Sequence, residues 1–477
     1  MSFNFFLSIL SGVLGGLSFD FPKVSFLVWF SFSFLFYILF TSRRPCRYFF
    51  LSGVVFYSIV IFWLGFVTRL GTFLLVLYLS FYWVVFSFLG KRTPKKYAIV
   101  ILPFLWVGLE FIRENIPAFG FGWAILGYSQ FNNLYLIQTA DILGAKLISF
   151  IIVTFNVIIA ISWKRKKVNL SHLLYALFIA AFSFVYSFYK INTYRPEEFV
   201  KVTVVQPNIP QSLKWKKEAR PFIIKRLLNL GIKTEKESLV VYPEASWPFL
   251  LDMDDREDFI NWAKEVKRDI IIGAVIREKE RFYNAAILLD KRGVIKGIYR
   301  KIILVPFGEY VPLRRFLNFV SVFNSLGDIS AGKKEVLFDY RNIKFSVLIC
   351  FEDVFGTLVS SVSYDSNFLI SITNDAWFGG NPEAMQHFSI MTLRAIENRI
   401  PIVRCANTGI SGYVDGVGRG HYLENSFSTV FFQKQQMFHV PLKKERTLYR
   451  RIGDWVFVVG FVLSLFYLYI VKRGHEG

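Results

Sequence analysis

The stretch Phe345-Ser346-Val347-Leu348-Ile349-Cys350-Phe351-Glu352-Asp353 is a short apolar run that ends in a thiol followed by two acidic residues. A run of this length and composition predicts a buried β-strand. Two other strand-like runs each end at a charged residue, one at Glu244 and one at Lys301. A carboxylate base, a cation and a thiol at neighbouring strand ends are the groups that covalent acyl transfer requires. The sequence therefore predicts Glu244, Lys301 and Cys350 as catalytic residues.

Much of the remaining chain is apolar enough to lie in a membrane. Of its 477 residues, 54% are hydrophobic, which is more than an ordinary soluble protein contains. Apolar segments of roughly 16–20 residues are near the length that crosses a hydrocarbon core of about 30 Å. We expect about eight transmembrane helices, at residues 3–19, 24–40, 48–67, 71–89, 97–112, 146–163, 170–188 and 455–471.

Basic residues indicate how these spans are oriented. Lys and Arg collect in every second loop and after the last span, and such loops are normally cytoplasmic. Both termini are therefore predicted to be cytoplasmic, and the long segment after the seventh span to face outward. The net charge of +21 follows largely from this topology, so we expect no nucleic-acid partner. The basic clusters are Arg43, Arg44 and Arg47; Lys91, Arg92, Lys95 and Lys96; Lys164, Arg165, Lys166 and Lys167; and Lys472 and Arg473.

The outward segment reads as one α/β domain. Strand-like runs alternate with helical patterns, which predicts layers with a mixed sheet inside. The predicted organisation is a membrane domain at 1–190 with seven helices, a catalytic domain at 199–445, and a last helix with a short tail at 454–477. Expected strands lie at 202–205, 239–242, 270–276, 284–289, 345–349, 368–373, 402–405 and 429–432, and expected helices at about 217–230, 256–267 and 383–399.

The cysteines and histidines favour a reactive thiol over a metal site. The three cysteines, at 46, 350 and 405, show no zinc-binding spacing, and the five histidines include no HExxH pattern. We therefore expect neither a metal nor a cofactor. A disulfide between Cys350 and Cys405 is the structural alternative for an outward pair, but the neighbouring acids and Lys301 suit a nucleophile better.

Residues 115–135, between the fifth and sixth spans, are aromatic, rich in glycine and free of Lys and Arg. Two interpretations stay open at this point. The segment is either an interfacial belt, where Trp and Tyr commonly lie, or a loop that handles lipid. Glu110, near the end of the fifth span, is the main ionisable residue inside a span, and its position favours a capped or snorkelling carboxylate over a transport path.

Each predicted catalytic residue has an ordinary alternative role when it is taken singly. A lone Glu or Lys is usually a solvated surface charge, and a lone Cys after an apolar run is usually a small core residue. Together they have complementary tasks: Glu244 takes the thiol proton, Lys301 stabilises the oxyanion, and Cys350 attacks.

Local sequence around the three positions resembles a known family. Val241-Tyr242-Pro243-Glu244, Tyr299-Arg300-Lys301 and Ile349-Cys350-Phe351-Glu352 resemble the Glu-Lys-Cys motifs of the nitrilase superfamily. Flanking segments are similar to those of its membrane-bound branch, the apolipoprotein N-acyltransferases. These segments are Gln206–Gln211 with Lys214-Trp215, Leu304–Pro312, Asn374–Gly379, Leu126–Gln130, Arg394–Asn398 and Asn407–Ser411.

The resemblance implies an α-β-β-α sandwich on the periplasmic side of a bacterial inner membrane, in a multi-pass protein. It also implies that Glu309 orients Lys301, that Glu352 supports the nucleophile turn, and that Trp215 belongs to a mobile arm near the entrance. Phe351 departs from the family, which often has tyrosine there; ring packing survives this change, but any role of a phenolic hydroxyl does not.

The implied reaction moves an acyl chain from a phospholipid, by resemblance its sn-1 chain, through a Cys350 thioester. The acceptor is the α-amino group of the S-diacylglyceryl-cysteine of an apolipoprotein. One copy holds a complete site, so we expect a monomer without a cofactor. The closest alternative is a membrane-anchored amidase or hydrolase in which water resolves the acyl-enzyme.

Overall fold

The computed structural model describes residues 3–253, 256–312, 329–379, 381–425, 428–443 and 445–473. The chain divides into two compact units, each of which is described by itself. Unit 1 comprises Met1–Tyr194 and Thr447–Gly477, and unit 2 comprises Arg195–Arg446.

Unit 1 is helical. Within the described residues, six helical segments are long and apolar enough to cross a membrane. They are α1 (Phe3–Asp20), the segment Pro22–Thr41 that contains α2 (Val28–Ser31) and α3 (Ser33–Thr41), α5 (Arg69–Gly90), α9 (Ala145–Arg165), α10 (Leu170–Thr193) and α18 (Trp455–Arg473). The predicted spans at 48–67 and 97–112 correspond to α4 (Cys46–Val60) and α6 (Ala98–Asn115). The first is only 15 residues long, and the second carries Glu110, Arg113 and Glu114, so neither belongs to these six.

One glycine on α6 and one on α18 allow these two helices to pack closely against each other. A Cβ atom on Gly108 of α6 would lie 2.2 Å from the ring of Phe461 on α18. A Cβ atom on Gly460 of α18 would lie 2.2 Å from the ring of Phe104 on α6. Small residues allow such close helix packing where no hydrophobic force draws helices together in lipid. The C-terminal helix is thus an integral part of unit 1.

Unit 2 contains two sheets. The first has the order β13-β1-β2-β4-β5-β6, with β3 paired to β4, and the second has the order β12-β11-β10-β9-β8-β7. The first sheet is built from β1 (Phe199–Gln206), β2 (Leu239–Val241), β3 (Leu250–Asp252), β4 (Asp269–Glu278), β5 (Arg281–Leu289), β6 (Ile295–Arg300) and β13 (Lys434–Pro441). The second is built from β7 (Phe338–Tyr340), β8 (Ile343–Ile349), β9 (Phe368–Thr373), β10 (Ile402–Ala406), β11 (Gly412–Val414) and β12 (Gly420–Tyr422).

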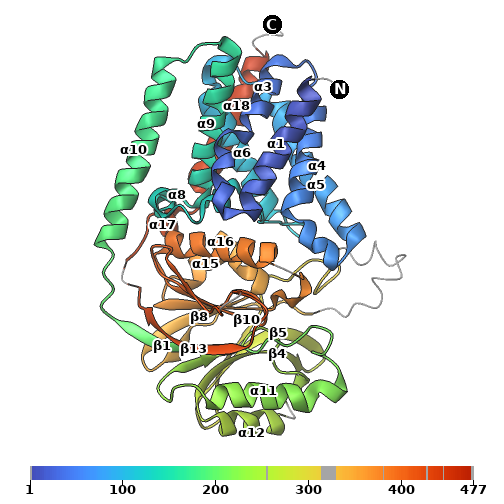
Figure 1. Ribbon diagram of the computed structural model, residues 1–477, viewed down its shortest axis with the longest axis vertical. Coiled ribbons are helices and arrows are strands. Elements are labelled where there is room, and N and C mark those ends of the chain that lie inside the picture. Colours follow the sequence, from blue (N-terminus) through green and yellow to red (C-terminus); the bar gives the residue numbers. More distant parts are fainter. Residues whose placement is uncertain are drawn as a thin grey trace. The chain divides into compact units, whose positions relative to one another are not determined.

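Helices cover the outer faces of both sheets (Figure 1). α11 (Arg220–Ile232) and α12 (Glu257–Val266) pack on the first sheet, and α15 (Gly356–Val362) and α16 (Asn381–Asn398) cover the second. Apolar side chains of both sheets, such as Val204, Val241 and Val347, form a common core between them. The predicted fold class, a helical membrane bundle with an α-β-β-α sandwich, is confirmed, whereas the predicted count of about eight spans is not.

One predicted strand is wrong. Residues 429–431 form a bend, and the edge strand β13 begins only at Lys434. The reason is local, because Phe431 has a φ of 58°, in the left-handed region that an extended strand excludes. The true strand was missed because its first half, Lys434-Gln435-Gln436, is polar and lacks apolar alternation.

Candidate active site

The three predicted catalytic residues all lie in unit 2, just beyond the ends of strands. Glu244 follows β2 by three residues, Lys301 directly follows β6, and Cys350 directly follows β8. Cys350 has a φ of 54°, which turns the chain sharply from β8 into the short helical turn Cys350–Val354. A non-glycine residue in this conformation costs free energy and is held there by its surroundings.

Lys301 is the central cation of this group. Its side chain is 1% exposed, and its Nζ lies 2.9 Å from Glu309 Oε2 and 3.6 Å from Glu244 Oε1. The Asn284 amide donates hydrogen bonds to both carboxylates, at 2.7 Å to Glu244 and 3.0 Å to Glu309. Sequence reasoning missed Asn284, although a polar residue at the start of the apolar run 284–289 was the available signal.

The charges around Cys350 act on it in opposite directions. Burial raises the pKa of the Cys350 thiol well above its usual value, and the Glu244 carboxylate adds to this, while Lys301 opposes it. Burial also works against ionised Glu309, yet the charge of Lys301 and the donors on Asn284 and Val305 keep the pKa of Glu309 below its usual value. The resting thiol is therefore neutral and needs a nearby base to become a nucleophile.

Glu352 ties two strand ends together beneath the nucleophile turn. One carboxylate oxygen accepts hydrogen bonds from the Tyr299 hydroxyl at 2.7 Å and from the backbone N–H groups of Ile302 and Ile303 at 2.6 and 3.1 Å. The other accepts from the Ile349 N–H at 2.8 Å. Burial raises the pKa of Glu352 to about 7, although hydrogen bonds to the ionised form lower it. The side chain thus joins the chain after β6, which carries Lys301, to the residue before Cys350.

The two predicted aromatic residues differ in exposure. Trp215 is 45% exposed and lies in the segment between β1 and α11. Phe351 is partly buried and packs edge-on against Phe355, with ring centroids 5.1 Å apart. Cys350 and Cys405 are free thiols, and the Cys405 thiol donates to the Val205 and Val241 carbonyls at 3.2 and 3.1 Å.

A second buried charged cluster lies behind the nucleophile turn, and sequence reasoning missed most of it. Arg404 Nη2 lies 3.0 Å from both Asp375 Oδ2 and His387 Nδ1, and Arg404 Nη1 lies 3.5 Å from Asp353 Oδ2. His387 Nε2 lies 2.7 Å from Asp353 Oδ1, and Glu383 Oε1 lies 3.4 Å from His387 Nδ1. The spacing of Glu383 and His387, four residues apart on the predicted helix 383–399, was the one signal in the sequence.

Among the described residues, Asp375, Glu383 and His387 are the one group whose donor atoms lie close enough to hold a metal ion. The guanidinium of Arg404 already places a positive charge 3.0 Å from two of these side chains. A divalent cation added there would face that charge at close range, so this donor set does not fit a metal ion.

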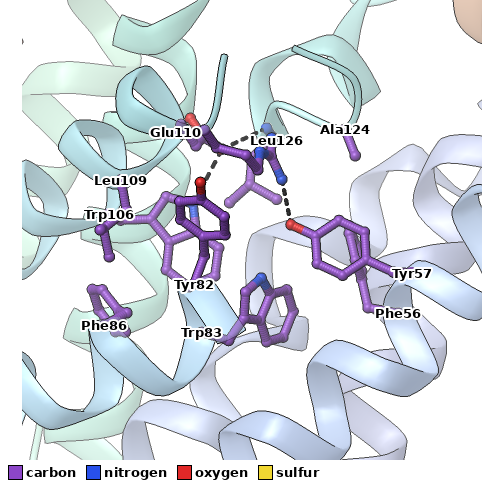
Figure 2. Close-up of a pocket in the computed structure, with 11 residues that line it drawn as sticks. Phe56, Tyr57, Tyr82, Trp83, Phe86, Trp106, Leu109, Glu110, Ala124 and Leu126 are labelled. Carbon is purple, nitrogen blue, oxygen red and sulfur yellow. Dashed lines mark hydrogen bonds between the residues drawn. The ribbon is translucent and has the colours of Figure 1, made fainter. Parts of the chain in front are cut away.

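Unit 1 contains a pocket that is lined mainly by aromatic side chains and that includes Glu110 and Arg113. Figure 2 shows Glu110 among the aromatic rings of Tyr57, Trp83 and Trp106. Glu110 Oε1 accepts hydrogen bonds from the Trp106 ring at 3.1 Å and from the Leu126 N–H at 3.0 Å. Arg113, whose guanidinium donates to the Tyr57 hydroxyl, also donates to the Trp123 carbonyl at 2.8 Å. Glu110 is thus a capped, buried carboxylate.

The segment after Trp123 is equally buried. Residues 123–131 lie inside unit 1, so this half of the predicted loop 115–135 is core and not an exposed interfacial belt. The two side chains Glu110 and Arg113 satisfy its backbone at Leu126 and Trp123.

Two family models match the chain. The apolipoprotein N-acyltransferase N-terminal domain matches residues 11–158, and the carbon-nitrogen hydrolase family matches residues 201–429. Among solved structures, an amidase of the nitrilase superfamily from Nesterenkonia aligns with a TM-score of 0.40 at 14% identity, over 52% of this chain and 92% of that chain.

Three similar proteins are apolipoprotein N-acyltransferases. An apolipoprotein N-acyltransferase from Geobacter metallireducens is 32% identical over 492 residues, which cover 96% of this chain and 94% of that protein. Apolipoprotein N-acyltransferases from Chlorobaculum tepidum and Rickettsia typhi are 29% and 32% identical, over 96% and 87% of this chain and 94% and 87% of those proteins. The chain therefore belongs to the apolipoprotein N-acyltransferase family, membrane-bound acyltransferases of lipoprotein biosynthesis within the nitrilase superfamily.

Proposed function

We propose that the chain acylates the α-amino group of the S-diacylglyceryl-cysteine at the N-terminus of apolipoproteins, with a phospholipid as the acyl donor and Cys350 as the covalent carrier. The observation that carries the proposal is that Lys301 contacts both Glu244 and Glu309, while the charges of Glu244 and Lys301 act on the thiol of Cys350. A base, an ammonium group and a thiol together supply what two successive acyl transfers require.

In the first half-reaction, Glu244 takes the proton of the Cys350 thiol. The sulfur then attacks the carbonyl carbon of the sn-1 ester of the phospholipid. Lys301, which Glu309 holds at 2.9 Å, stabilises the oxyanion of the tetrahedral intermediate. The ester C–O bond breaks, the lysophospholipid leaves as an alcohol with the proton from Glu244, and a thioester remains on Cys350.

In the second half-reaction, the neutral α-amino group of the acceptor attacks the thioester carbonyl. Glu244 accepts a proton from the attacking nitrogen, and the C–S bond breaks. The sulfur leaves as a thiolate and regains a proton from Glu244, so the products are an amide and free enzyme. The two substrates use the same site in turn, which predicts ping-pong kinetics. No step needs a cofactor, because the thioester retains the free energy of the ester.

We further propose that the protein lies in the bacterial inner membrane as a monomer, with unit 2 in the periplasm and both termini in the cytoplasm. The basic loops after the second, fourth, sixth and last spans support this orientation. Cysteine scanning with a membrane-impermeant thiol reagent, in a protein whose three native cysteines are replaced by alanine, tests it: Lys166→Cys should stay unlabelled in intact spheroplasts, and Lys291→Cys should react.

The competing function is hydrolysis, in which water replaces the amine in the second half-reaction. The deciding experiment incubates the purified protein with phospholipid and a diacylated lipopeptide, and follows both by mass spectrometry. The proposal expects one added acyl chain on the lipopeptide and a transient adduct of the same mass on Cys350. Release of free fatty acid with an unchanged lipopeptide would show a hydrolase, and activity without any Cys350 adduct would exclude the covalent route.

A further inference from the structure

We propose that Lys214 is a second ammonium group of the reaction centre. It holds the segment before Trp215 against the backbone of Glu244 and balances the negative charge that develops on Cys350. The inference rests on the proposed function and adds a positioning residue to it.

The position of Lys214 is unusual for a lysine. The residue is 3% exposed, although its neighbours Trp215, Lys216 and Lys217 on the same segment are exposed. Its Nζ donates a hydrogen bond of 3.1 Å to the backbone carbonyl of Glu244. This carbonyl accepts only one of the three ammonium protons, and a lysine is almost never fully buried without a partner of opposite charge. The negative charges of Glu244 and of an ionised Cys350, which favour the charged lysine, are the available partners.

The segment that carries Lys214 is fixed at its base by a chain of amide hydrogen bonds. Asn407 donates to the Ile209 carbonyl at 2.8 Å and accepts from the Ile209 N–H at 2.9 Å. Asn407 also donates to Asn374 at 3.0 Å, and Asn374 donates to Gln211 at 2.9 Å. Lys214 is the last buried residue of this segment before the exposed residues 215–218. The Lys216 N–H still donates to the Leu213 carbonyl at 3.1 Å.

The charges of the site balance only when Lys214 is included. Glu244 and Glu309 contribute two negative charges, and Lys301 contributes one positive charge. Transfer of the thiol proton to Glu244 forms a thiolate and neutralises Glu244, so the summed charge does not change. This sum is minus one without Lys214 and zero with it. Excess negative charge opposes thiolate formation, so the additional ammonium favours it.

The groups that act on Lys214 come from two strand ends. Burial lowers the pKa of Lys214 to about 8, while the charges of Glu244 and Cys350 oppose that decrease. Lys301 and Glu309 are the next charged groups, through their contacts with Glu244 and Asn284. The amine is thus charged at neutral pH and loses its charge in mildly alkaline solution. The alkylation rate of Cys350 should therefore change its dependence on pH where Lys214 loses its charge.

The test measures alkylation of Cys350 by iodoacetamide in the full-length protein in detergent, from pH 6 to pH 10, with the modified peptide quantified by mass spectrometry. Wild type should show a rate that stops rising near pH 8, where Lys214 loses its proton. Lys214→Met should alkylate roughly tenfold more slowly at pH 7.5, which corresponds to about one pKa unit of the thiol. Lys214→Arg keeps its charge, so its rate should continue to rise above pH 8.

Lys216→Met is the matched control, because it removes an exposed lysine two residues away. The proposal is overturned if the dependence of the alkylation rate on pH is the same for Lys214→Met and Lys216→Met. It is also overturned if Lys214→Met is alkylated more slowly than wild type by the same factor at every pH. If Lys214→Met does not fold, Lys214→Arg decides, since a profile identical to wild type overturns it as well. Iodoacetamide needs neither phospholipid nor lipopeptide, so this result is independent of whether acyl transfer itself is found.

Discussion

Unit 2 contains two buried charged clusters that differ in how far their charges are enclosed. Around Lys301, the side chains of Glu244 and Glu309 remain 11% and 15% exposed, and residue Cys350 is partly exposed. Around Arg404, the side chains of Asp353 and Asp375 are 0% and 3% exposed. The first cluster can still meet a substrate, whereas the second is closed.

This difference in exposure separates the groups that can react with a substrate from the groups that can only stabilise the fold. A charge that is paired on every side is costly to disturb and has no position left for a ligand. A charge with one open side can bind a developing oxyanion or move a proton. The comparison therefore predicts that substitutions around Lys301 mainly reduce activity, and that substitutions around Arg404 mainly reduce stability.

The largest effect on activity should come from Cys350→Ala. Loss of the nucleophile should abolish both the acyl adduct and lipopeptide acylation, and leave the melting temperature of the protein nearly unchanged. Cys405→Ala is the matched control, because Cys405 is also a free thiol but lies in the core. It should retain acylation and lower the melting temperature. Acylation by the Cys350→Ala protein would contradict the assignment of the open cluster as the reactive one.

The largest effect on stability should come from Arg404→Met. Removal of this guanidinium leaves Asp353 and Asp375 buried with His387 as their remaining cation, and breaking a buried pair in this way costs about 3–5 kcal/mol. Thermal unfolding in detergent measures the change. Arg341→Met, which breaks an exposed pair with Glu237, is the control and should have almost no effect. Equal melting temperatures for both variants would show that the closed cluster does not stabilise the fold.

The same contrast explains what the sequence could predict. Glu244 and Cys350 stand out because each closely follows an apolar run, and Lys301 because it directly follows a strand-like run. Glu244 and Lys301 follow strands of the first sheet and Cys350 follows a strand of the second, so the packing of the two sheets brings them together. Arg404 lies inside the run 402–406, which reads as an ordinary core strand. Its partners Asp353, Asp375 and His387 come from three other elements, and no periodicity relates them. Their contacts depend on the packing of α16 on the second sheet, which local pattern does not determine.

Glu352→Gln should have an intermediate effect on stability. Both carboxylate oxygens of Glu352 accept hydrogen bonds, so the NH₂ group of glutamine would face either the Ile349 N–H or the donors at Tyr299, Ile302 and Ile303. A buried donor opposite another donor costs about 1–3 kcal/mol. The turn at Cys350 should also loosen, so acylation should fall together with the melting temperature. Glu424→Gln, at an exposed site, is the control, and an unchanged melting temperature for Glu352→Gln would contradict the bridging role.

Glu383→Gln should have the smallest effect near pH 5, and its effect should grow as the pH rises. Burial and the neighbouring charge of Asp375 raise the pKa of Glu383 to about 7, above its value in the unfolded chain. The folded protein therefore holds this proton more tightly, and the resulting stability is fully present below about pH 4.5 and is lost as pH rises through about 7. Glutamine resembles the protonated acid at every pH. Wild type should thus match Glu383→Gln in melting temperature near pH 5 and fall below it near pH 8, and a constant difference would show that Glu383 stays ionised inside the closed cluster.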